Sequence, residues 1–258
     1  MRLALSTIGM LIVFVFESSV SAQKKKESKD PVPQIVVAAP LAIEAGKTTK
    51  LILRGVKIED ISEIRLHEPK STGKVIGKSK KVPVPNNANL SQVGDSEVEV
   101  EITLPSEVPG GTVPFSVVGP GGESKPHLLI VKDDTPIVME KEPNDGFKNA
   151  QPLSYPCVVE GSIRQSQDVD VFRLDAKQGE RLHIELQANR FGSPVDGTFT
   201  LYDDAARIVA NADDSARSVD PILTLTVAKS GTYYLSLIDA HDQGGDIFRY
   251  RLIVRLAK

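Results

Sequence analysis

The feature that most constrains this chain is a recurring pattern of short runs in which apolar and polar residues alternate. The clearest run is 97–104, where valine, isoleucine and leucine alternate with glutamate and threonine. A period of two places one apolar face on a core and one polar face in water, as in a half-buried β-strand. No stretch keeps a helical period over three turns, so the sequence predicts an all-β protein.

Runs of this kind predict strands in both halves of the chain, separated by turns rich in glycine and proline. In the first half they are 34–37, 49–54, 63–67, 97–104, 113–118 and 127–131. In the second half they are 181–186, 222–227, 233–237 and 248–252. Short strands at this spacing are typical of sandwiches. We expect two β-sandwich domains in tandem, the first immunoglobulin-like and the second jelly-roll-like.

The first 22 residues have the pattern of a secretory signal peptide. Met1 and Arg2 give a positive start, residues 3–16 are almost entirely apolar, and small residues lead to Ala22. The apolar run is shorter than the roughly 20 residues of a spanning helix, which favours cleavage after Ala22 over an uncleaved anchor. We expect an exported protein, periplasmic or extracellular, with no transmembrane segment after cleavage.

Composition divides the rest of the chain. Between Pro33 and Met139 the only arginines are Arg54 and Arg65, whereas nine arginines follow from Glu140 onward. A polar segment at 132–136 that ends in proline marks the join. The predicted organisation is a signal peptide at 1–22, a flexible polar leader at 23–32, an immunoglobulin-like sandwich at 33–132, an acidic linker at 133–145 and a jelly-roll-like sandwich at 146–258.

A series of short motifs covers the second half. They are Glu140-Lys141-Glu142-Pro143-Asn144-Asp145, Glu160-Gly161-Ser162-Ile163, Asp168-Val169-Asp170-Val171-Phe172 and Ser230-Gly231-Thr232-Tyr233-Tyr234-Leu235. In this order and spacing, the second half resembles the bacterial pre-peptidase C-terminal domain, also seen as the collagen-binding domain of clostridial collagenases. The resemblance spans about residues 140–255. Collagen binding is not implied, because at least one tyrosine of the Tyr233-Tyr234 pair belongs in the core.

The first half has Gly46 before a strand, then Leu53-Arg54-Gly55, then a Pro-Gly-Gly turn at 109–111. This order is similar to the IPT/TIG-like, immunoglobulin-like modules of bacterial extracellular proteins.

The resemblance of the second half implies a calcium site. In collagenase members an acidic linker binds calcium together with an aspartate cluster at the start of a strand. The matching positions are Glu140, Glu142, Asn144, Asp145, Asp168 and Asp170. Calcium takes about six to eight hard oxygen ligands, which carboxylates and an amide supply. The alternative is a turn capped by Asn-Asp with solvated glutamates.

Three other features favour structural interpretations. The acidic residues at 203–204 and 211–214 bracket a hairpin, where Asp and Asn suit turns better than a second cation site. Cys157 lies beside an apolar run and is predicted to be a buried thiol. The lysine-rich segment 70–81 is predicted to be a solvated, mobile loop. It has no aromatic side chains on which bases could stack.

No enzyme motif is present: the chain has no His-Glu-x-x-His, no Gly-x-Ser-x-Gly and no phosphate-binding loop. A net charge of -3 argues against a nucleic-acid partner. We expect a non-catalytic accessory protein, stabilised by calcium, that binds an extracellular or envelope protein or polysaccharide. The alternatives are a purely structural envelope protein without an ion, an accessory component of a secreted peptidase system, and a cryptic hydrolase.

Overall fold

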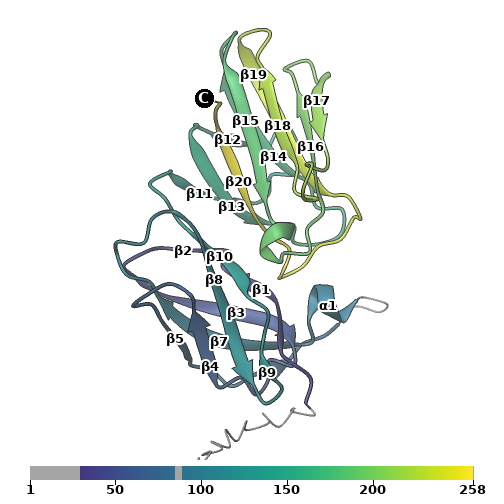
Figure 1. Cartoon of the computed structure of the whole chain (residues 1–258). Helices are drawn as coiled ribbons and strands as arrows, with labels where there is room; N and C mark the ends of the chain where they lie inside the picture. Colours follow the sequence, from purple (N-terminus) through teal and green to yellow (C-terminus); the bar gives the residue numbers. More distant parts are fainter. Residues whose placement is uncertain (1–29, 85–88, 258) are drawn as a thin grey trace, which may run out of the picture.

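The computed structural model describes residues 30–84 and 89–257 (Figure 1). The predicted signal peptide and residues 23–29 of the leader lie outside this part. The structure confirms the all-β fold with two sandwiches in tandem. In the described part the helices are α1 (Leu90–Val93) and a short 3-10 helix, η1 (Asn189–Phe191). None of the helices described there is long and apolar enough to cross a membrane.

The first sandwich consists of two sheets that pack face to face. The first sheet has the order β1 (Gln34–Ala39), β3 (Thr48–Val56), β7 (Ser96–Thr103) and β5 (Thr72–Val75), with β6 (Lys80–Lys81) also on β7. The second has the order β2 (Ala42–Ile43), β10 (His127–Val131), β8 (Gly111–Gly119) and β4 (Glu63–Leu66), with β9 (Gly122–Glu123) on β8. As the alternation predicts, Val98, Val100 and Ile102 of β7 are buried.

Residues 72–75 and 80–81 of the lysine-rich segment are part of this sheet, so the expectation of a loop is wrong for them, whereas the lysines are exposed as expected. These residues form β5 and β6, which both pair with β7. Lys74 lies opposite Glu101, and Lys80 Nζ lies 3.1 Å from Glu97 Oε2. Cross-strand pairs of opposite charge stabilise a sheet. These lysines therefore balance the acidic face of β7.

The second sandwich also has two five-stranded sheets. One has the order β11 (Ile137–Met139), β13 (Cys157–Ser162), β20 (Arg249–Leu256), β15 (Arg181–Gln187) and β18 (Ile222–Thr226). The other has the order β12 (Gln151–Leu153), β14 (Asp170–Ala176), β19 (Gly231–Asp239), β16 (Gly197–Tyr202) and β17 (Ile208–Ala212). Strand β11 lies inside the segment predicted as linker, so the second sandwich already begins at Ile137. Cys157 is fully buried, as expected, and burial raises the pKa of its thiol.

One apolar cluster joins the two sandwiches. Val36, Val37 and Ile130 of the first sandwich belong to the same buried cluster as Phe191 and Phe248 of the second. Apolar surface removed from water contributes about 25 cal/mol per Å², so this cluster stabilises the contact between the sandwiches.

The tightest approach at this interface is made by Gly192, directly after η1. Gly192 has φ +87°, and a Cβ there would overlap the carbonyl oxygen of Val36 and lie 2.7 Å from His127 Cε1. His127 is enclosed at the same point, and burial lowers its pKa to about 4, so its ring is neutral at pH 7. The backbone conformation and the contact both require glycine.

We expect Gly192→Ala to loosen the interface, with Gly179→Ala as the matched control. Gly179 has φ +85° and open space around its Cβ position, so its substitution carries only the left-handed backbone penalty of about 1 kcal/mol. Gly192→Ala adds the overlap with Val36. Urea unfolding should show a larger loss of stability for Gly192→Ala, and small-angle X-ray scattering a larger radius of gyration. Equal losses in the two variants would contradict the interface described here.

Candidate metal centre

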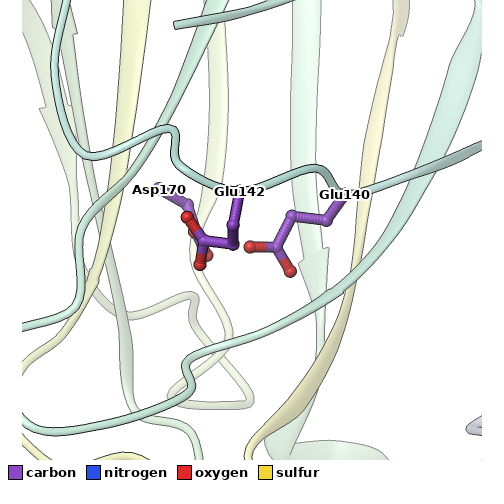
Figure 2. A group of neighbouring side chains, drawn as sticks. All are labelled: Glu140, Glu142 and Asp170. Carbon is purple, nitrogen blue, oxygen red and sulfur yellow. The ribbon is translucent and has the colours of Figure 1, made fainter. Parts of the chain in front are cut away.

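Three acidic side chains lie close together near the start of the second sandwich (Figure 2). Glu140 and Glu142 come from the segment after β11, and Asp170 is the first residue of β14. One oxygen of each carboxylate lies within 4.8 Å of the others. Figure 2 shows the three carboxylates turned toward one another.

Hydrogen bonds to its main-chain atoms hold the acidic segment against the sandwich. Glu140 N donates to Glu160 O at 3.0 Å, which extends the β11–β13 pairing. The Gln151 side chain spans the next residues: its Oε1 accepts from Lys141 N at 2.7 Å, and its Nε2 donates to Met139 O at 3.0 Å. In this extended conformation Glu140 and Glu142 face the same side.

Each carboxylate has one oxygen held by a donor. Glu140 Oε2 accepts from Ser162 N at 2.7 Å, Glu142 Oε2 accepts from Asn144 N at 3.1 Å, and Asp170 Oδ2 accepts from Tyr250 OH at 2.7 Å. The second oxygens of Glu140 and Asp170 are buried and find no hydrogen-bond partner within the described residues. With both carboxyl groups ionised these two buried oxygens have no donor, whereas a proton on Asp170 would supply one.

Asn144 adds a buried amide to the same region. The residue has no exposed surface, and its main-chain oxygen accepts from Val171 N at 3.0 Å, which ties it beside the start of β14. Neither polar atom of its side chain has a hydrogen-bond partner in the part of the chain that is described. A buried amide left without partners costs about 1–3 kcal/mol.

The electrostatics of the cluster favour a cation or a proton. Burial and the neighbouring Glu140 raise the pKa of Asp170 to about 9. Burial, Glu140 and Asp168 also raise the pKa of Glu142. Arg164, half exposed, offers a counter-charge with its Nε 3.5 Å from Glu142 Oε1. Without a cation, Asp170 is therefore protonated at pH 7.

The two remaining predicted ligands have other positions. Asp168 is buried, but its Oδ2 accepts from Arg164 N at 2.5 Å, so it contributes charge while closing the turn before β14. Asp145 is exposed and does not belong to the cluster of carboxylates. The structure thus brings together Glu140, Glu142 and Asp170, with Asn144 buried nearby.

The second acidic segment, residues 203–214, begins with a turn. Asp203 Oδ1 accepts from the main-chain N–H groups of Ala205 and Arg207, both at 3.0 Å, and Oδ2 pairs with the Arg207 guanidinium. Farther on, Asp213 and Asp214 are exposed and approach Asp196 within 4.8 Å. Thr198 donates to Asp213, and His241 Nδ1 lies 3.2 Å from Asp196.

Sequence reasoning missed the neutral residues that shape the acidic cluster. Tyr250 lies in an alternating run, which predicts that it points inward, but nothing in the sequence pairs its hydroxyl with Asp170. Gly161 is a second example, because a Cβ there would lie 2.5 Å from the Tyr250 hydroxyl and 2.6 Å from Glu140 Oε2. The phenol and the acidic segment approach each other only because this position has no side chain.

Comparison with known proteins adds distant similarities. No protein-family model and no curated protein matches the chain. The pre-peptidase C-terminal domain of a Bacillus anthracis collagenase is 18% identical over 45% of this chain and 100% of its own, with a TM-score of 0.35. The Aeromonas hydrophila periplasmic lysozyme inhibitor PliG is 13% identical over 48% of this chain and 99% of its own, with a TM-score of 0.33. The Vibrio cholerae secreted serine protease VesC is 12% identical over 84% of this chain and 48% of its own, with a TM-score of 0.29.

The first of these structures carries the name of the family that the motifs of the second half resemble. All three TM-scores lie below 0.5, so the fold described above rests on the strands and sheets themselves.

The raised pKa of Asp170 predicts how stability depends on pH in a chelator. The unfolded chain releases this proton near pH 3.8, whereas the folded protein keeps it up to about pH 9. The free energy of unfolding should therefore fall from pH 7 to 8.5, by at most about 1.4 kcal/mol per pH unit for one proton. Asp170→Asn should remove this slope and be the more stable protein at pH 8.5. Urea unfolding in a chelator measures both.

Asp220 provides the matched control, because it is equally buried but has its donors. Its carboxylate accepts from the main-chain N–H groups of Ala188, Asn189 and Arg190. Asp220→Asn should lower stability by about 1–3 kcal/mol and leave the slope between pH 7 and 8.5 intact. A flat wild-type profile would show that Asp170 is ionised without a cation.

Proposed function

We propose that this protein is an exported, non-catalytic accessory protein whose second sandwich holds calcium, and that it binds an extracellular or envelope protein or polysaccharide. The observation that supports calcium is the set of buried polar atoms with no hydrogen-bond partner among the described residues: Glu140 Oε1, Asp170 Oδ1 and the Asn144 amide. A cation bound here would satisfy the oxygens and balance the like charges.

The donor set fits calcium better than other common metals. Glu140, Glu142, Asp170 and Asn144 would supply carboxylate and amide oxygens, which hard cations prefer. Zinc prefers imidazole and thiolate ligands, and the acidic cluster holds neither. Because calcium accepts irregular oxygen geometry more readily than magnesium, it is the cation that we assign.

Calcium in this position would have a structural role. It would join the segment after β11 to the start of β14 and replace the proton on Asp170. The next residues are already ordered by an aromatic contact, since the Phe147 ring stacks on Tyr234 with centroids 4.6 Å apart. The ion would therefore stabilise the segment between β11 and β12, which carries Phe147.

A second candidate is a purely structural envelope protein that needs no ion. It is favoured by the apolar cluster that runs through both sandwiches, because this cluster stabilises their arrangement without calcium. The two candidates differ in one measurable quantity, the dependence of stability on calcium.

Calcium should raise the melting temperature of the wild-type protein relative to the same protein in a chelator. A ligand of the folded state alone contributes about 2.7 kcal/mol when it is present at a hundred times its dissociation constant. Differential scanning calorimetry measures the shift, and magnesium at the same concentration should give a smaller one.

Two variants locate this effect. Glu140→Gln should lose most of the calcium-dependent rise, because one buried carboxylate ligand is removed. Asp145→Asn is the control: Asp145 is acidic and close in sequence, but exposed, so the rise should persist. The calcium assignment is overturned if the wild-type melting temperature ignores calcium, and its placement is overturned if both variants lose the response equally.

A further inference from the structure

A cleft of about 320 Å³ lies where the two sandwiches meet. The first sandwich contributes residues of β1 and β3 and the turn after β1, and the second contributes residues of β11, β13 and β20. Small-molecule and side-chain pockets commonly have about this volume and occur at domain interfaces, where apolar walls surround a few polar groups.

The walls of the cleft are apolar and unusually exposed. Ile52 of the first sandwich is 42% exposed and Met139 of the second is 60% exposed, and both line this cleft. They come from different sandwiches and flank the same space together with Pro40 and Leu41. An apolar group held between them would remove both side chains from water.

The polar part of the cleft contains a buried arginine. Arg251 is only 4% exposed. Its Nη1 donates to the neutral Gln187 Oε1 at 3.0 Å, whereas its Nε has no hydrogen-bond partner among residues 30–84 and 89–257. The Nε forms an ion pair with Glu160 Oε1 at 3.4 Å.

That carboxylate is shared with a second cation. Lys132 Nζ lies 3.0 Å from Glu160 Oε1, so two buried or half-buried positive charges depend on one acid. Asp133 also acts on Arg251, but it is exposed and therefore screened by water. Arg249 adds a further positive charge to the lining. A carboxylate would complete the charge balance, and arginine is well suited to bind one.

We propose that this cleft binds the C-terminal residue of a polypeptide partner, with an apolar side chain between Ile52 and Met139 and the carboxylate on Arg251 and Arg249. The inference rests on the binding role proposed above and specifies its site and ligand. Part of the lining is preformed, because Tyr250 is one of the lining residues and its hydroxyl donates a hydrogen bond to Asp170.

The test uses the intact protein and two small probes, N-acetyl-leucine and its neutral analogue N-acetyl-leucinamide. Titration followed by amide NMR shifts should show saturable binding of the acid, with shifts at residues that line the cleft. The amide should bind at least about tenfold more weakly, because it cannot pair with the arginines. Equal binding of acid and amide, or no saturable binding of the acid, would overturn the proposal.

A matched pair of variants locates the site. Ile52→Glu places a negative charge on the wall and should abolish binding of the acid. Leu128→Glu is the control, because Leu128 is also on a strand of the first sandwich and 43% exposed, close to the 42% of Ile52, but does not line the cleft. Loss of binding in both variants, or in neither, would place the site elsewhere. Cooperative melting of each variant establishes that it is folded.

The same samples separate this inference from the calcium proposal. A melting temperature that rises with calcium, without binding of N-acetyl-leucine, would overturn the cleft and support the metal centre. Binding of N-acetyl-leucine to a protein that ignores calcium would support the cleft and overturn the metal centre.

Discussion

The apolar cluster shared by the two sandwiches is the constraint on which the rest of the structure depends. Each sandwich buries its own sheets, but Val36, Ile130 and Phe191 connect the two cores into one continuous contact. Because this contact fixes the sandwiches against each other, the segment that joins them crosses a defined surface instead of spanning open solvent. The cleft is a result of the same contact, since its two walls belong to different sandwiches.

The acidic cluster of Glu140, Glu142 and Asp170 is the electrostatic exception in this otherwise apolar arrangement. The fold holds Glu140 through Glu160 and Ser162, and holds Asp170 through its place in β14. These contacts bring carboxylates together at the expense of their mutual repulsion. The like charges thus do not shape the site. Main-chain pairing brings them together, and a proton or a cation must then relieve their repulsion.

The sequence predicts most of the fold because alternation records burial directly. Strand β10 has the predicted bounds, and the apolar face of β7 is the core that its pattern indicates. Strand β11 escapes such reasoning because its three residues are too few to show a period. In the acidic cluster, spacing predicts that Glu140 and Glu142 lie on the same side of the segment. The position of Asp145 depends on a turn, and the approach of Tyr250 to the acidic segment depends on the space left by Gly161. Such tertiary contacts leave no local pattern.

Gly192 bears on how the two sandwiches are inherited. Its contact with Val36 joins main chain to main chain, and the His127 ring packs against the same point. If recombination joined the second sandwich to a different domain, that domain would have to offer main chain to Gly192 in the same geometry as Val36 does. We therefore expect gene fusion and domain shuffling to move this pair as a single module, although each half has the size of an independent domain.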